Sequence, residues 1–122
     1  MKNRIASFKY AMNGIRLMFK SGPNFIIQLI IAFITLSAGL YFQITAIEWT
    51  IILICIAGVL SAEIFNTAIE KMVDHLSPEK NKYAGETKDL AAGAVLLFSI
   101  ITAIIGIIIF YPYLIIRDLR LF

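Results

Sequence analysis

The sequence predicts an all-α integral membrane protein in which three helices cross the membrane and a fourth lies on its surface. Of the 122 residues, 60% are hydrophobic, well above the roughly 45–50% of ordinary soluble domains. The apolar residues are concentrated in three segments, each long enough to cross a bilayer, for which a helix needs about 17–25 residues. A chain of this length forms one domain, so we expect a single membrane domain over residues 1–122.

The expected surface helix covers residues 3–20. Its apolar side chains recur at three- and four-residue steps, and its basic side chains take the opposite face. Such a helix suits an anionic membrane surface; packing against the protein's own helices is the alternative. The apolar face comprises Ile5, Phe8, Met12, Ile15 and Phe19, and the basic face includes Lys2, Lys9, Arg16 and Lys20.

The three expected membrane spans are residues 25–42, 47–69 and 90–116. Tyr111, Pro112 and Tyr113 mark the far boundary of the third span. Residues 1–23 carry five basic residues and no acid, and segment 70–89 carries four lysines, whereas the loop between the first two spans carries none. The positive-inside rule therefore places the N-terminus and segment 70–89 in the cytoplasm, although Arg117 and Arg120 at the other end oppose this mildly.

A polar stripe interrupts the second span. At about 100° per residue, five polar residues fall within one narrow sector of a helix: Glu63, Asn66, Thr67, Glu70 and Asp74. A carboxylate in hydrocarbon costs about 2.5–3.5 kcal/mol on the translocon scale, so it is retained where it is paired, hydrated or used. The stripe predicts an intramembrane site for a cation, a phosphate or a hydroxyl group.

Two further charges enter the membrane close to this stripe. Lys88 and Asp89 precede the small residues at the start of the third span, and small residues let another helix approach closely. Carboxylates, an amide and a lysine at one membrane face favour a site for Mg²⁺ and a polyphosphate. Glu63 is then left as a general base towards a hydroxyl group. No glycine-rich nucleotide loop and no His/Cys metal cluster occurs in the sequence, and we expect no nucleic-acid partner.

Several motifs resemble the prokaryotic diacylglycerol kinase and undecaprenol kinase family. They are AEIFNTAIEKMVD over residues 62–74, SPE over residues 77–79 and KDLAAGAVL over residues 88–96, with weaker similarity in SFKYAMNGI over residues 7–15. The resemblance implies a homotrimer of the bacterial inner membrane with active sites shared between protomers. It also implies transfer of the ATP γ-phosphate to a membrane lipid alcohol, with Mg²⁺ as cofactor.

The resemblance assigns roles to residues by position. Glu63 would be the catalytic base, and Glu70 would be both a metal ligand and a nucleotide contact. The other nucleotide contacts would be Tyr10, Glu79, Lys88 and Asp89. Asn66 and Asp74 would line the site, and Arg16 and Phe25 would lie near the lipid substrate.

The chain departs from the family pattern at three places. Gly22 stands where the family usually has a glutamate that serves as a second metal ligand, so weaker Mg²⁺ binding is expected. Ile26 replaces a basic residue, and Lys80-Asn81 replaces a common Tyr-His pair.

Two other function classes fit part of the pattern. In a transporter or channel subunit, Glu63 and Glu70 would form an ion or proton relay, but such a conduit also needs ionisable groups near the outer face. A regulatory homologue without catalysis is the other alternative, suggested by Gly22. The sequence leaves the lipid open between diacylglycerol and undecaprenol.

Overall fold

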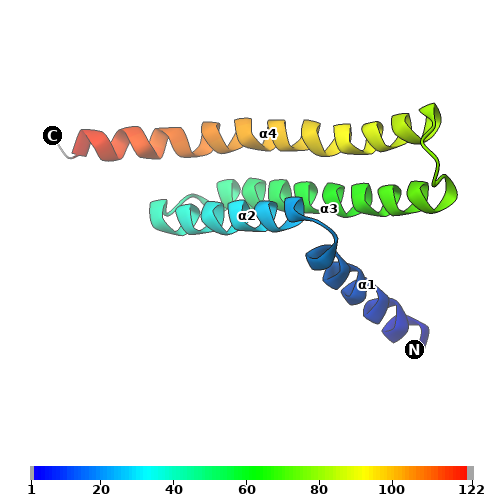
Figure 1. The fold of residues 1–122 in the computed structure, drawn as a ribbon. Coiled ribbons are helices and arrows are strands. Elements are labelled where there is room, and N and C mark those ends of the chain that lie inside the picture. The colour runs from blue at the N-terminus through cyan, green and yellow to red at the C-terminus, as the bar shows by residue number, and fades with distance from the viewer. Residues whose placement is uncertain (1, 121–122) are drawn as a thin grey trace.

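The structure is a computed structural model that describes the backbone of residues 2–120 and the side chains of residues 3–116. These residues form four helices and no strand (Figure 1), which confirms the all-α fold class. The side chains of Lys2, Arg117 and Arg120, which entered the charge patterns above, lie outside the described side chains. The helices are α1 Lys2–Ser21, α2 Pro23–Phe42, α3 Ala46–Leu76 and α4 Lys82–Arg120.

Three of these helices are long and apolar enough to cross a membrane: α2, α3 and α4. A rise of 1.5 Å per residue makes α3 about 46 Å and α4 about 58 Å long, whereas the hydrocarbon core measures about 30 Å. Both helices are therefore longer than the hydrocarbon core is thick. The rise per residue also places Glu63 about 22 Å along α3 from Glu48, which lies in the first turn of that helix.

The helices extend beyond the expected membrane spans, because hydropathy reports the apolar part of a helix and not its polar turns. Segment 70–89 is mostly helical, and only residues 77–81 separate α3 from α4. The expected third span, residues 90–116, lies within α4, which begins at Lys82 and continues through Pro112 as far as Arg120.

The helices are arranged around α3, along which both α2 and α4 lie (Figure 1). The surface helix α1 leaves the start of α2 at an angle, and its last turns contact α2 and α3. Met18 is buried there, and the ring of Phe19 meets that of Phe25 edge to face with centroids 5.6 Å apart. The junction of α1 and α2 and the turn at residues 77–81 lie at the same end of the bundle.

The break between α1 and α2 is set by local sequence. Gly22 has an extended backbone at φ 176°, and Pro23 occupies the first turn of α2, where its fixed φ suits a helix start and its missing N–H costs nothing. A Cβ atom at Gly22 would meet no atom within 4 Å. The position therefore accepts a larger side chain without steric conflict.

Glu48 ties the opposite end of the bundle together. A capping box opens α3: the Thr45 N–H donates to Glu48 Oε1 at 2.9 Å, and the Glu48 N–H donates to Thr45 Oγ1 at 3.2 Å. The Tyr113 hydroxyl of α4 donates to the same Glu48 oxygen. One carboxylate thus starts α3 and anchors α4, next to a small apolar core around Ile52.

Gly58 allows α3 and α4 to pack closely. A Cβ atom at Gly58 would overlap the ring of Phe98 on α4, with three ring carbons inside contact distance. Gly106, which lies on α4, has no atom within 4 Å of an added Cβ. The two glycines form a matched pair in which only one is sterically required.

We expect Gly58→Ala to lower the free energy of unfolding by about 1–3 kcal/mol, because the methyl group displaces the Phe98 ring and overpacks the contact. Gly106→Ala should be neutral or stabilising by up to ~1 kcal/mol, since alanine favours the helix. Reversible unfolding in detergent micelles, followed by circular dichroism, measures both. Equal stability of the two variants would show that α3 and α4 do not meet at Gly58.

Candidate functional site

The polar stripe lies entirely on α3, and the exposure of its side chains rises along the helix. Glu63 and Asn66 are buried, with 6% and 8% of their surface exposed. Thr67 and Glu70 are half-buried, and Asp74 is exposed close to the turn at residues 77–81. The stripe therefore leads from a buried carboxylate to open solvent within three helical turns.

Asn66 and Glu70 form a pair of oxygen-bearing groups one helical turn apart. Asn66 Nδ2 donates to Glu70 Oε1 at 3.1 Å, which leaves the Asn66 carbonyl oxygen buried and without a hydrogen-bond partner among the described residues. Leaving such an atom unpaired costs about 1–3 kcal/mol. An unpaired buried oxygen beside a carboxylate is a suitable place for a cation.

The residues present fit Mg²⁺ held jointly with a phosphate ligand. Among the side chains described, those of residues 3–116, no three His, Cys, Asp or Glu groups lie close enough to hold a metal by themselves. Mg²⁺ commonly takes one or two carboxylates and completes its shell with phosphate oxygens and water. Glu70 and the Asn66 carbonyl oxygen supply a donor set of this kind.

Glu63 has a partner on a different helix. Gln28 Nε2 of α2 donates to Glu63 Oε2 at 3.3 Å. The hydrogen bond holds one carboxylate oxygen of Glu63 and leaves the other available. Sequence spacing gave no indication of this pair, since the two residues lie 35 positions apart.

Lys88 reaches the water end of the stripe from α4, where its ammonium group forms an ion pair with Asp74. Both side chains are partly exposed, at 38% and 63%, and exposed pairs of this kind contribute only about 0–1 kcal/mol. Lys88 therefore lies at the site and is free to exchange Asp74 for another anion at little cost.

Residues 9–110 match the family model described as prokaryotic diacylglycerol kinase. This chain belongs to that family. The match covers most of α1, all of α2 and α3, and α4 as far as residue 110, and so includes the whole polar stripe and Lys88.

Individual relatives agree with this assignment. The chain is 40% identical over 108 residues to the undecaprenol kinase of Bacillus subtilis, a match that covers 88% of both chains. It is 32% identical over 105 residues to the diacylglycerol kinase of Synechocystis, covering 85% of this chain and 60% of that one. It is 28% identical over 108 residues to the diacylglycerol kinase of Haemophilus influenzae, covering 88% and 92%.

For four of the other residues with predicted roles, the structure shows exposure or packing and no hydrogen bond to the stripe. Tyr10 and Arg16 are exposed on α1, and Glu79 is exposed in the turn at residues 77–81. Phe25 is buried against Phe19, where it holds α1 to α2. Their contacts with nucleotide and lipid stay predictions.

We expected both Lys88 and Asp89 to lie close to the stripe. In the structure, Lys88 pairs with Asp74 of the stripe, whereas Asp89 lies elsewhere on α4. Consecutive helical residues point about 100° apart, and Asp89 lies on an open depression formed by α4 alone. The depression is lined by Glu86, Asp89, Leu90, Gly93, Ala94 and Leu97. Of the small residues at the start of the third span, Gly93 and Ala94 line this depression, whereas Ala91 is buried.

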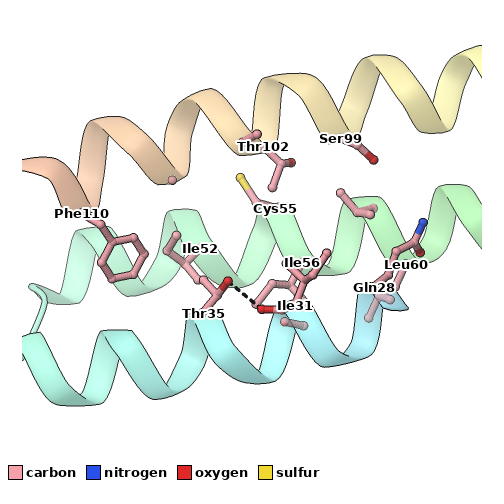
Figure 2. Close-up of a pocket in the computed structure, with 14 residues that line it drawn as sticks. Gln28, Ile31, Thr35, Ile52, Cys55, Ile56, Leu60, Ser99, Thr102 and Phe110 are labelled. Atoms are coloured by element: carbon pink, nitrogen blue, oxygen red, sulfur yellow. Dashed lines mark hydrogen bonds between the residues drawn. The ribbon is translucent and has the colours of Figure 1, made fainter. Parts of the chain in front are cut away.

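A cavity of about 290 Å³, which the spacing of residues did not predict, lies between α2, α3 and α4 (Figure 2). Its lining is mostly aliphatic, and Gln28 and Leu60 lie at one end while Phe110 lies at the other. The Thr102 hydroxyl and the Gln28 carbonyl oxygen are buried in this region without partners among the described residues. The sequence could have pointed to Gln28, because it is the one amide side chain between residues 25 and 42, in an otherwise apolar span.

Proposed function

We propose that this protein is a lipid kinase that transfers the γ-phosphate of ATP to undecaprenol. The observation that carries the proposal is the 40% identity to an undecaprenol kinase over 88% of both chains, compared with 32% and 28% to two diacylglycerol kinases. Diacylglycerol is the second candidate, because it also presents a primary hydroxyl group at the membrane interface.

Glu63 acts as the general base in this proposal. Its carboxylate is buried on α3 close to the membrane boundary, where the hydroxyl group of a lipid alcohol comes to rest. Gln28 holds one carboxylate oxygen, and the other receives the hydroxyl proton as the lipid oxygen attacks the γ-phosphorus. General-base assistance contributes typically about 10²–10⁴-fold in rate.

The phosphates of ATP lie further along the stripe. Glu70 and Asn66 would hold Mg²⁺, which supplies neutralisation of phosphate charge when bound. Lys88 turns from Asp74 to the phosphates as a point charge, a change that costs little because the ion pair is exposed. Tyr10, Glu79 and Asp89 complete the nucleotide contacts, and Arg16 and Phe25 lie on the lipid side.

The proposed location is the bacterial inner membrane, with the N-terminus and the turn at residues 77–81 in the cytoplasm. The positive-inside pattern supports this orientation, and ATP is available on that side. Since α1 and this turn lie at the same end of the bundle (Figure 1), the orientation also gives the stripe direct access to nucleotide.

The proposed assembly is a homotrimer in which neighbouring protomers share each site. The position of Asp89 supports it, because the depression around Asp89 is lined by small residues and by no other helix of the protomer. A second protomer that packs here would bring its own stripe to Asp89.

The shared site predicts complementation between two inactive variants. A mixture of Glu63→Gln and Asp89→Asn protomers, dissociated and reassembled, should recover up to roughly a quarter of the wild-type rate, because some sites then combine intact residues from two protomers. Each variant alone should stay inactive. A mixture as inactive as its components would mean that Glu63 and Asp89 act within one protomer, or not in one site.

The transporter alternative has less support, since Glu48, the first carboxylate of α3, has a structural role. Glu48 accepts hydrogen bonds from the Thr45 N–H and from Tyr113, so it is committed to a helix cap. In the described part of α2 no charged residue occurs. An ion relay through the bundle would lack groups between Glu63 and Glu48.

We expect Glu63→Gln to lower phosphotransfer by about 10²–10⁴-fold, because the amide cannot accept the hydroxyl proton, while ATP binding stays nearly unchanged. The measurement is transfer of radiolabel from ATP in mixed micelles, with undecaprenol and diacylglycerol offered separately. Glu48→Gln is the matched control, since glutamine also serves in a capping box and the site lies at the other end. Label in diacylglycerol alone would show that diacylglycerol is the substrate and undecaprenol is not. Label in neither lipid would refute the proposed kinase activity.

We expect Gly22→Glu to lower the Mg²⁺ concentration needed for half-maximal activity, on the order of tenfold for one added ligand contributing about 1.4 kcal/mol. The backbone at this position is extended and open, so the substitution introduces no strain. Gly22→Gln, which adds the same bulk without the charge, should leave the Mg²⁺ dependence unchanged. Identical Mg²⁺ titrations for both variants would show that Gly22 is not a vacant metal-ligand position.

A further inference from the structure

Gln28 is the polar group that α2 contributes to the buried carboxylate. Pro23–Phe42 contains no charged side chain, and its hydroxyl groups at Thr35 and Ser37 donate to carbonyl oxygens of their own helix. Gln28 instead donates across to Glu63 Oε2 at 3.3 Å. A hydrogen bond to a carboxylate is stronger than a neutral one, and this one is formed where little water competes.

The orientation of the Gln28 amide follows from the chemistry of its partner. An ionised carboxylate only accepts hydrogen bonds, so the NH₂ group must face Glu63 and the carbonyl oxygen must face away. That oxygen is buried and has no partner among the described residues. The arrangement satisfies the ionised form of Glu63 at the expense of one unpaired oxygen, which costs about 1–3 kcal/mol.

No other described group competes for this role. On α1, Arg16 and Lys20 are exposed. On α4, the nearest cation is Lys88, which pairs with Asp74 near the turn. On α3, the Asn66 amide donates to Glu70. Gln28 alone therefore controls the position and the hydrogen bonding of the Glu63 carboxylate.

We propose that Gln28 is a positioning residue that serves both protonation states of Glu63, an inference that rests on the proposed function of Glu63 as a base. Before transfer, Gln28 Nε2 donates to the carboxylate. During transfer the O–H bond of the lipid breaks, the proton goes to Glu63, the lipid oxygen bonds to the γ-phosphorus, and ADP leaves with the electrons of the broken P–O bond. Glu63 then carries an O–H group, and the Gln28 carbonyl oxygen accepts from it.

The change between the two states needs only rotation of terminal groups. The last torsions of Gln and Glu are broad and roughly two-fold, so a half-turn exchanges donor and acceptor without moving either helix. A side chain with a donor alone or an acceptor alone cannot do this. Gln28 borders the cavity between the helices (Figure 2), which leaves room for the rotation.

The first test compares steady-state kinetics of Gln28→Met with Thr35→Val. Methionine keeps the length of the side chain and removes both hydrogen-bonding groups, so kcat should fall about 10- to 100-fold with the KM for ATP unchanged. Thr35 lines the same cavity and donates only to the Ile31 carbonyl at 2.8 Å, so Thr35→Val should retain wild-type kcat. A kcat for Gln28→Met within twofold of wild type would overturn the proposal.

The second kinetic test is the pH profile of Gln28→Glu, which a role in packing alone would not alter. The variant keeps the shape of the side chain but must share one proton with Glu63, since two adjacent carboxylates repel. The acid limb of the kcat profile should therefore move to higher pH by about one unit or more. A profile that superimposes on that of the wild type contradicts the proposal.

A third measurement separates this inference from the kinase assignment. Dicyclohexylcarbodiimide reacts with protonated carboxyl groups in membranes, and mass spectrometry of peptides measures its addition to Glu63 without any need for catalysis. Gln28→Met should label severalfold faster than wild type across a pH series, and Glu63→Gln should not label at that position. If Gln28→Met labels faster than wild type but the protein phosphorylates no lipid, the Gln28–Glu63 interaction is supported and the proposed kinase activity is refuted. Equal labelling of wild type and Gln28→Met would overturn the link whatever the activity.

Discussion

The free-energy cost of burying the Glu63 carboxylate is the constraint on which the rest of the site depends. An uncompensated carboxylate in the membrane would destabilise α3, and three features of the fold offset that cost. Glu63 lies within four helical turns of the exposed end of α3, Gln28 of α2 donates to it, and the stripe beyond it leads to water. The close packing of α2 on α3 and the break at Gly22 are therefore requirements of the site as much as of the fold.

The sequence predicted the helical fold class and the three membrane-crossing helices because apolar composition over about 20 residues is a strong signal. It did not predict how far the helices continue beyond the apolar spans. Polar helical turns, such as residues 70–76 and 82–89, have no hydropathic signature, and α4 accommodates Pro112 near its end. The structure adds a capping box formed by Thr45 and Glu48, and α3 starts at Ala46, one residue before the span predicted from hydropathy.

Some features of the site could be predicted from the sequence and others could not, depending on whether they involve one helix or two. Relations within one helix follow from spacing, so the common face of Glu63, Asn66 and Glu70 could be anticipated. Relations between helices depend on the rotation of each helix about its own axis, which is set by packing, as at Gly58 and Phe98. For that reason spacing did not show the Gln28–Glu63 hydrogen bond.

The two glutamates in the apolar part of α3 show how surroundings decide the role of one residue type. Glu48 accepts hydrogen bonds from the Thr45 N–H and the Tyr113 hydroxyl. The first caps α3 and the second joins α3 to α4, so both are structural. Further along α3, Gln28 donates to Glu63 and Asn66 donates to Glu70, and the carbonyl oxygen of each amide is buried without a partner among the described residues. Native proteins leave few buried polar atoms unsatisfied. These two oxygens therefore distinguish the end of α3 that carries the stripe from the end at Glu48, where the carboxylate accepts hydrogen bonds from Thr45 and Tyr113.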